Sequence, residues 1–311
     1  MIRMLSTPVA TLGLLALLAA AAPARAQQTQ SEEAENRAKL LQTLPKDAAK
    51  RVFGSMTDAY PSAARTIGAY ARGCIAGAKA LATDGATWQV MRLSRNRNWG
   101  HPDLIALIER LAKRAPQVGW RGLLVGDISQ PRGGPMLTGH ASHQVGLDAD
   151  LWLTPMPARR LAVDERETMS ATNVVAANWM DVDPARWTEQ HRNIIRLAAM
   201  ESAVVRIFVN PAIKQALCRD PGPDRGWLSK VRPMWGHNYH FHIRIGCPAG
   251  DETCVDQDPP PGGDGCGKEL SDWLDNQYKT IFGPKRPPGP AAKPLPLSAM
   301  PEACQQIVVN R

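Results

Sequence analysis

Five of the seven histidines in the 311-residue sequence fall in two short stretches. Residues 139–150 read GHASHQVGLDAD, and residues 237–242 read HNYHFH. Imidazole and carboxylate side chains ligate metals and transfer protons near neutral pH. These stretches are therefore the candidate chemical site, whereas His101 and His191 stand alone and are predicted to be surface or capping residues.

The second stretch opens a predicted strand over residues 239–245. Alternate side chains of a strand point to opposite faces, so one face should meet the core and the other should be polar. The expected core face holds Tyr239, Phe241, Ile243 and Ile245, and the polar face holds His240, His242 and Arg244. Two imidazoles on one face can serve a single site, one as a metal ligand and the other as a proton acceptor.

The first stretch runs into a predicted strand over residues 147–153. The polar face of this strand would carry Asp148, Asp150 and Trp152. His143 precedes the strand, and Gly146 lets the backbone bend between them. If the two predicted strands are neighbours, His143, Asp150 and His242 converge.

Two histidines and one carboxylate with an open coordination position suit a catalytic Zn²⁺. Such an ion lowers the pKa of bound water to about 7, and a nearby free histidine can accept the water proton. The alternative is a polar strand face with two buried, hydrogen-bonded histidines. The sequence has no HExxH, GxSxG, Walker or GxGxxG motif, and Ser142 is interpreted as a hydroxyl that either supports a ligand or bonds the backbone.

The remaining pattern predicts the elements that position these residues. Apolar residues at helical spacing, or a proline at the first position, favour helices over residues 103–115, 190–200, 211–217 and 270–281. Apolar runs rich in residues of high strand propensity favour strands over residues 123–127 and 204–209. Strands and helices do not alternate regularly. We therefore predict an α+β fold, in which a small central antiparallel sheet carries the zinc site and is flanked by helices and long disulfide-tied loops.

The N-terminus reads as a targeting segment. Residues 1–26 have Arg3, an apolar run and a small-x-small ending, which is typical of a signal peptide and indicates export. The alternative is an uncleaved anchor. Cleavage would remove Arg3 and Arg25 and reduce the net charge from +8 to +6, with no stable membrane insertion left. A basic exported chain favours an anionic polymer, and export makes nucleic acid the poorer partner.

Export also bears on the six cysteines, which can pair completely in an oxidising compartment. Six cysteines allow fifteen connectivities, and only Cys247 and Cys254 are close enough in sequence to suggest a local loop. The predicted organisation is a signal peptide over 1–26, a polar leader over 27–50, a domain over 51–282 that carries the candidate zinc site, and a Pro-rich tail over 283–311. Cys304 would tie the tail back.

The chain resembles the penicillin-insensitive murein endopeptidases, in the wider lysostaphin and D-Ala-D-Ala metallopeptidase group. The resemblance rests on GHASHQVGLDADLWL and WGHNYHFHIRIGCP, and on TIGAYARGCIAGA, QVMRLSRNRNWGHPDL, RIFVNPAIKQALC and PPPGGDGCG, in order over most of residues 66–273. It implies a periplasmic zinc enzyme that cuts the D-alanyl–meso-diaminopimelyl cross-link of peptidoglycan.

The resemblance also implies roles for individual residues. His143, Asp150 and His242 would bind zinc, His240 would be the catalytic base, and His237 a further active-site imidazole. His140 is interpreted as an auxiliary ligand or, more simply, as a residue that holds a ligand in place. The implied disulfides are Cys74–Cys304, Cys218–Cys266 and Cys247–Cys254.

Two features depart from the family pattern. Some relatives carry an Asp-x-x-His pair that serves an extra metal site, but Asn178 and Asp181 stand at about that distance here, and a fully equipped second site is not expected. The leader over 27–50 and the stretch around 159–180 have no assigned counterpart. Two other functions stay open at this point: a D,D- or L,D-carboxypeptidase that trims stem peptides, and a non-catalytic wall-binding protein.

Overall fold

A computed structural model describes residues 35–285, 289 and 292–309 of the chain. The predicted signal peptide and the first part of the leader lie outside these residues. Within the described ranges, no helix has the length and apolar character needed to cross a membrane.

The predicted strands near the histidines lie in a six-stranded sheet with the order β4-β6-β7-β10-β8-β9. Its strands are β4 (Trp88–Val90), β6 (Leu123–Val125), β7 (Asp148–Trp152), β10 (His240–Ile245), β8 (Val204–Val209) and β9 (Val231–Pro233). The contiguous strands β6, β7, β10 and β8 pair antiparallel, which confirms the α+β class with a central antiparallel sheet.

The two outer pairs, β4–β6 and β8–β9, are parallel, so the sheet as a whole is mixed. Parallel neighbours need a crossover connection, usually a helix. Helix α3 (Pro102–Arg114) lies between β4 and β6 in the chain, and α6 (Pro211–Arg219) and η3 (Gly226–Lys230) lie between β8 and β9. The prediction of an antiparallel sheet did not consider these crossover connections, which make the two outer strand pairs parallel.

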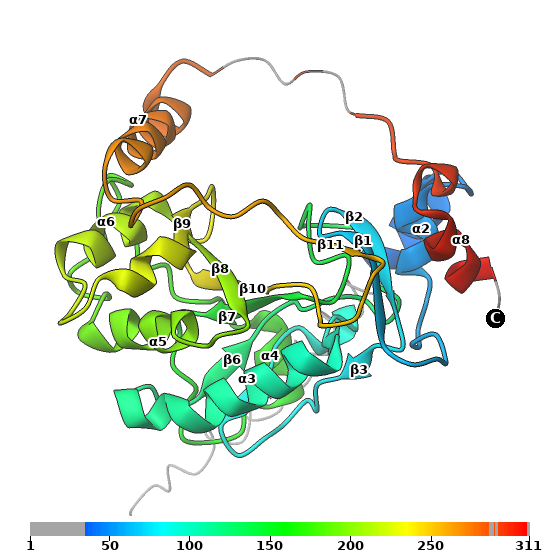
Figure 1. Ribbon diagram of the computed structural model, residues 1–311, viewed down its shortest axis with the longest axis horizontal. Helices are drawn as coiled ribbons and strands as arrows, with labels where there is room; N and C mark the ends of the chain where they lie inside the picture. Colours follow the sequence, from blue (N-terminus) through cyan, green and yellow to red (C-terminus); the bar gives the residue numbers. More distant parts are fainter. Residues whose placement is uncertain (1–34, 286–288, 290–291, 310–311) are drawn as a thin grey trace, which may run out of the picture.

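The middle of the sheet is covered on both faces. Every residue of β7 and β10 is buried, the polar ones included. Helix α3 and helix α5 (Glu189–Ala199) pack against the sheet through apolar side chains, and Figure 1 shows them on the same side of it. The predicted core placement of Tyr239 is wrong: it precedes β10, lines a cavity beside this strand and is 42% exposed.

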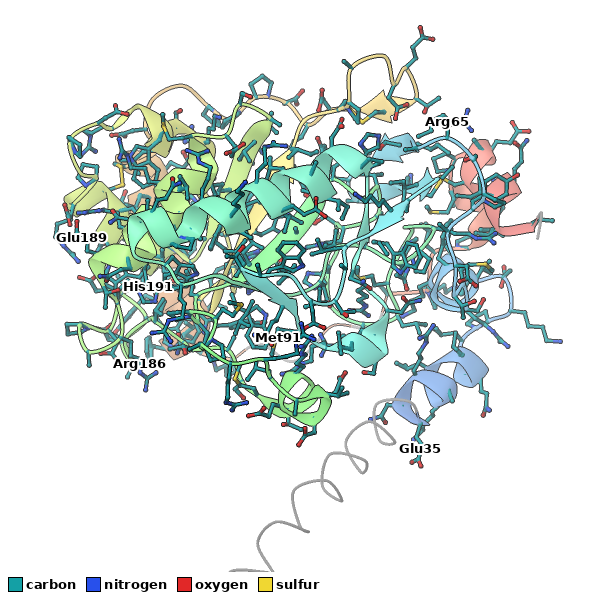
Figure 2. The ribbon with its side chains drawn as sticks, turned by 90° about the horizontal axis from the view of Figure 1, so that it is seen from below. Glu35, Arg65, Met91, Arg186, Glu189 and His191 are labelled. Carbon is teal, nitrogen blue, oxygen red and sulfur yellow. A yellow bond between two sulfur atoms is a disulfide. The ribbon has the colours of Figure 1, made fainter. Side chains whose placement is uncertain are left out.

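The two solitary histidines cap helices, as predicted, but they are buried rather than on the surface. His101 is the N-cap of α3, and its Nδ1 accepts the Asp103 backbone N–H at 3.2 Å. His191 lies in the first turn of α5, where its Nδ1 accepts the Thr188 backbone N–H at 3.1 Å. Figure 2 places His191 at the opposite end of the molecule from Arg65.

A second, smaller core joins the two ends of the described chain. A three-stranded sheet of β2 (Arg72–Ala76), β1 (Arg65–Ala69) and β11 (Cys254–Val255) packs with α2 (Ala49–Gly54) and α8 (Glu302–Val309). Figure 1 shows α2 and α8 side by side. The buried residues of this smaller core include Phe53, Ile67, Met300 and Ile307. The end of the predicted tail is thus a packed helix that shares a core with the start of the domain.

Short elements complete the structure. They are β3 (Lys79–Ala80) and β5 (Trp99–Gly100), which pair with each other, α4 (Val163–Thr168), α7 (Lys268–Phe282), η1 (Leu93–Arg95), η2 (Ala115–Val118) and η4 (Leu297–Ala299). Residues 35–43 of the leader are helical as well.

All six cysteines form disulfides, in the same three pairs that the family resemblance implies. Cys74 is bonded to Cys304, Cys218 to Cys266, and Cys247 to Cys254. The first bond crosses the smaller core, the second fixes the start of α7 to the end of α6, and the third closes the loop between β10 and β11. No cysteine in the described residues is free.

Candidate metal centre

The pairing of β7 with β10 brings the two histidine stretches together. Asp150 lies directly opposite His242, and Asp148 lies opposite Arg244. Because opposite residues of an antiparallel pair share a face, both carboxylates lie on the same side of the sheet as the histidines of β10. The expected neighbourhood of these two strands is confirmed.

His143 enters the site from the loop that precedes β7. Its backbone adopts a left-handed conformation with φ of 64°, which is uncommon for a residue with a side chain. Its ring Nδ1 lies 2.6 Å from the Ile128 carbonyl oxygen, and its backbone N–H donates to Asp148 Oδ2 at 3.0 Å. The carbonyl oxygen accepts a hydrogen bond from Nδ1–H, so Nε2 is the ring nitrogen that faces Asp150.

The Asp150 carboxylate lies at the centre of the imidazoles. Its Oδ1 is 3.4 Å from His143 Nε2, 3.4 Å from His242 Nδ1 and 3.5 Å from His240 Nε2. Its Oδ2 is 3.5 Å from His140 Nε2. Asp150 Oδ1 and His143 Nε2 are buried and have no hydrogen-bond partner among the described residues. Buried polar atoms without partners are costly, and a bound cation would satisfy both of them.

Asp148 orients the His242 ring from the side opposite Asp150, a role that the sequence did not reveal. Its Oδ1 lies 2.9 Å from His242 Nε2, and its two oxygens accept Arg244 Nε and a terminal guanidinium N–H at 2.7 and 3.1 Å. With Nε2 facing a carboxylate, His242 presents Nδ1 to Asp150. Carboxylates commonly orient metal-binding histidines in this way. The signal in the sequence was the position of Asp148, two residues before Asp150 on the same strand face.

A second missed carboxylate, Asp127, holds His140. The Oδ2 of Asp127 is 3.0 Å from His140 Nε2 and also accepts a hydrogen bond from Arg97 at 2.8 Å. Arg95 approaches the same oxygen at 3.5 Å. Asp127 follows β6, a strand that the sequence predicts, but nothing in the spacing links it to the histidines. His140 therefore lies between two carboxylates, and its ring centroid is 4.2 Å from that of His143.

His237 and His240 form the wall of the site on the side of β9. Their ring centroids are 4.7 Å apart, and the His237 ring centroid is 5.8 Å from that of His242. His237 has a φ of 53° and follows Gly236, whose φ is 67°, so it reaches the site through a tight turn, as expected. Its Nδ1 lies 2.6 Å from the Trp235 carbonyl oxygen, which fixes the orientation of the ring.

Burial and neighbouring charges lower the pKa of some histidines of the site and raise that of another. Burial lowers the pKa of His240 to about 3 and that of His242 to about 4, so both rings are neutral at neutral pH. Burial also disfavours the charged form of His143, but the Asp150 carboxylate outweighs it and raises the pKa of His143 to about 9. Burial would raise the pKa of Asp150, yet the surrounding imidazoles hold it well below its usual range.

A cavity of about 280 Å³ opens beside Asp150 and His240. Its other walls come from Arg92, Arg95, Gly126, Asp127, His140, Trp152, Ser170, Ala171 and Tyr239. The cavity has a cationic side, formed by the two arginines, and an aromatic side. Tyr239, which was expected in the core, belongs to this rim.

Three of the predicted residues form a tight group of potential ligands. One donor atom from each of His140, His143 and Asp150 lies within 4.8 Å of the other two. His242, the predicted third ligand, is next to this group, with its ring centroid 4.5 Å from that of His143. Asn178 and Asp181 lie apart from it: Asn178 accepts the Met180 N–H, and Asp181 pairs with Arg219.

Buried imidazoles around one carboxylate, at the wall of a cavity in the middle of a sheet, are typical of a metalloenzyme centre. The chain belongs to the penicillin-insensitive murein endopeptidase family, whose profile matches residues 66–309. This match includes the whole six-stranded sheet, the candidate metal centre and α8.

Curated relatives are similar over most of their length. A penicillin-insensitive murein endopeptidase of Haemophilus influenzae is 46% identical over 249 residues, which cover 79% of this chain and 82% of the relative. Proteins with the same description from Yersinia enterocolitica and Klebsiella pneumoniae are 45% and 44% identical. The alignments cover 79% and 81% of this chain and 86% and 89% of those relatives.

Proposed function

We propose that this protein is a zinc-dependent murein endopeptidase that hydrolyses the D-alanyl–meso-diaminopimelyl cross-link of peptidoglycan. The observation that carries the proposal is the pair of buried, unpartnered atoms Asp150 Oδ1 and His143 Nε2, 3.4 Å apart, with His242 Nδ1 at the same distance from the carboxylate. Membership of the murein endopeptidase family supports the substrate class.

The donor set fits zinc. Two imidazole nitrogens and one carboxylate oxygen are its usual ligands in catalytic sites. All three side chains here are buried, and the two imidazoles are oriented by the Ile128 carbonyl oxygen and by Asp148. His143, Asp150 and His242 would hold the ion, and His140, on the other carboxylate oxygen, would be auxiliary. Zn²⁺ supplies a Lewis acid that activates water and polarises the peptide carbonyl.

The two remaining histidines of the site would accept a proton and donate a hydrogen bond. His240 is neutral at neutral pH and its Nε2 lies 3.5 Å from the Asp150 carboxylate, so this nitrogen can accept a proton from an attacking water next to the ligands. His237 is next to it on the same wall and could donate a hydrogen bond to the oxygen on which charge develops. Because no step needs an acyl-enzyme serine, a β-lactam would have nothing to acylate.

The cavity beside the ligands suits a peptide that carries carboxylates. Arg95 and Arg92 line it, and Arg95 already lies 3.5 Å from the carboxylate of Asp127. Guanidinium groups bind carboxylates with good geometry. The free carboxylate next to the scissile nitrogen of diaminopimelate would therefore be attracted to this side. A periplasmic location, from cleavage of a signal peptide over 1–26, would bring the protein to this polymer.

The test is muropeptide analysis of cell-wall sacculi incubated with purified mature protein, with and without a chelator. We expect cross-linked dimers to decrease and monomers to increase, and chelation to abolish the change until zinc is restored. The matched control is Asn178→Ala, an exposed-loop change away from the ligands. Loss of terminal D-alanine with dimers intact would indicate a carboxypeptidase instead, and no product with full zinc occupancy would contradict the proposal.

A further inference from the structure

A second hollow is lined by Trp235, which is two residues before His237 in the chain. It has a volume of about 380 Å³ and lies between the loop that joins β9 to β10 and one face of α7. Its lining residues are Trp235, Glu269, Asp272, Trp273, Asn276 and Thr280. The two indoles are 6.1 Å apart at an angle of 62°, and Trp235 is 39% exposed. Neither the metal ligands nor the proton-transferring histidines use these side chains.

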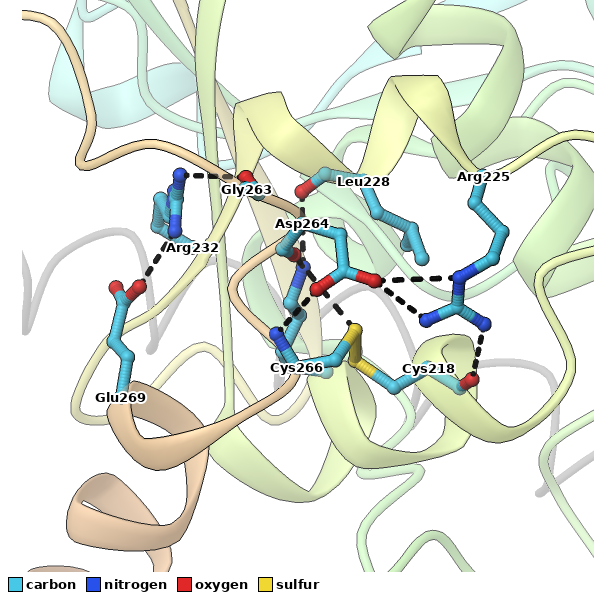
Figure 3. Close-up of a disulfide and its surroundings, with 9 residues drawn as sticks. Cys218, Arg225, Leu228, Arg232, Gly263, Asp264, Cys266 and Glu269 are labelled. Carbon is cyan, nitrogen blue, oxygen red and sulfur yellow. Dashed lines mark hydrogen bonds and ion pairs between the residues drawn. A yellow bond between two sulfur atoms is a disulfide. The ribbon is translucent and has the colours of Figure 1, made fainter.

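The helix that carries most of this hollow is firmly held. Disulfide Cys218–Cys266 ends one residue before the N-cap of α7, and Glu269 in its first turn pairs with Arg232 of β9, as Figure 3 shows. Farther along, the fully buried Gln277 donates to the Trp179 carbonyl and exchanges hydrogen bonds with Asn210.

The hydrogen-bonded pair of Asn210 and Gln277 also holds the other wall of the hollow. The side-chain amide nitrogen of Asn210, which donates to Gln277, also donates to the Gly236 carbonyl oxygen at 2.8 Å. Gly236 lies between Trp235 and His237, so the two walls are connected through one buried amide pair. A hollow with preformed walls is what a binding site needs, because little ordering entropy is lost when the ligand binds.

The chemistry of the lining selects a neutral, hydroxyl-rich ligand. Indole faces pack against apolar C–H surfaces, and nearby carboxylates and amides accept and donate hydrogen bonds to hydroxyl and acetamido groups. Asp272 pairs with Lys268 on the helix surface, but a carboxylate has about four acceptor sites and can take further donors. Glu269 and Asp272 would repel the carboxylates of a stem peptide, which the arginine-lined cavity attracts.

We infer that this hollow binds the N-acetylated glycan strand of the polymer whose peptide is cut at the metal centre. The inference rests on the proposed function for the identity of the polymer. The reach is suitable: the Cα atoms of Trp235 and His237 are at most about 7.6 Å apart, and a stem of about four extended residues spans about 14 Å. A sugar on the two indoles would therefore leave its stem peptide able to enter the cavity beside Asp150.

The direct test is binding of a peptide-free oligomer of N-acetylglucosamine, measured by titration calorimetry and tryptophan fluorescence in the presence of a chelator. We expect saturable binding to the wild-type protein, and about tenfold or greater weakening in Trp273→Ala, because an aromatic anchor carries a large share of a small interface. The matched control is Tyr278→Ala. Tyr278 is an exposed aromatic of the same helix, about 140° further round, and does not line the hollow.

A second variant, Asp272→Asn, keeps the test valid if Trp273→Ala fails to fold, and it should also weaken binding of the oligomer. Absence of saturable binding in the wild type, or equal affinity in both hollow variants and Tyr278→Ala, would overturn the inference. Because these titrations need no turnover, their result is independent of whether the protein cuts murein. On an active preparation, Trp273→Ala should raise KM for sacculi more than it raises KM for a cross-linked peptide without sugar.

Discussion

The buried carboxylate of Asp150 gives the candidate centre its most direct test. Replacing His143, Asp150 or His242 by alanine removes one of three proposed ligands, so each variant should lose zinc. The measurement is metal content of the purified variants by mass spectrometry, with His140→Ala as the comparison that should retain more metal. Full occupancy in all three ligand variants would show that the ligands are elsewhere.

His240 and His242 share one strand face but are assigned different tasks. His240→Ala should keep its zinc and lose about 10²–10⁴-fold in turnover, because general-base assistance contributes that much. His242→Ala should lose both zinc and turnover. Zinc content and muropeptide cleavage are measured on the same preparations. If His240→Ala loses the metal while His242→Ala keeps it, the two roles are interchanged.

Lys214 predicts a pH dependence that does not involve the metal centre. Its ammonium group is fully buried and donates to the carbonyl oxygens of Leu228 and Asp264 at 2.9 and 2.5 Å. Burial lowers its pKa to about 7, whereas an unfolded lysine titrates near 10.4. Between these values the unfolded chain binds more protons, so the contribution of Lys214 to the free energy of unfolding rises with pH.

We therefore expect stability to increase between pH 7 and pH 9, by at most about 1.4 kcal/mol per pH unit from this one group. Urea denaturation at several pH values measures the slope. Lys214→Met removes the titrating group, and its slope should be smaller than that of the wild type. Parallel pH profiles for the two proteins would mean that Lys214 stays charged in the fold.

At the scale of the elements, the three disulfides should differ in their contribution to stability. In the chain-entropy account the contribution grows with loop length, so Cys218–Cys266, with a separation of 48 residues, should contribute about 4 kcal/mol, and Cys247–Cys254, with 7, about 2 kcal/mol. Paired Cys→Ser variants and denaturant unfolding measure both. The reverse order would show that local strain or packing outweighs loop entropy.

Local patterns were enough to predict most elements around the site. The helix at residues 103–115 and the strand at 239–245 are both present within a few residues, because their apolar periodicity matches the faces that they bury. The direction of the outer strands depended on crossovers between distant segments, which periodicity does not encode. Asp127 and Tyr239 were missed for a similar reason: their contacts are made only when several loops meet beside the central strands β7 and β10.

For the whole molecule, the shared core of α2 and α8 predicts that the C-terminal tail is needed for stability. Deleting residues 283–311 would expose the apolar surface that Met300 and Ile307 cover and would leave Cys74 without its partner. We expect a lower denaturation midpoint and an additional free thiol. Thermal unfolding and thiol labelling of the denatured, unreduced protein measure these effects, and full-length Cys304→Ser separates loss of the bond from loss of packing. A truncated protein as stable as the full chain would contradict this view.

The 230-residue separation of Cys74 and Cys304 also has a consequence for the order of events during biogenesis. A chain that emerges from its N-terminus exposes Cys74 long before Cys304, and Cys218, Cys247, Cys254 and Cys266 all emerge in between. An oxidant that acts as soon as thiols appear would join Cys74 to one of these earlier cysteines. Correct maturation should therefore depend on thiol–disulfide exchange, which reshuffles early mispairings, and not on the supply of oxidant alone.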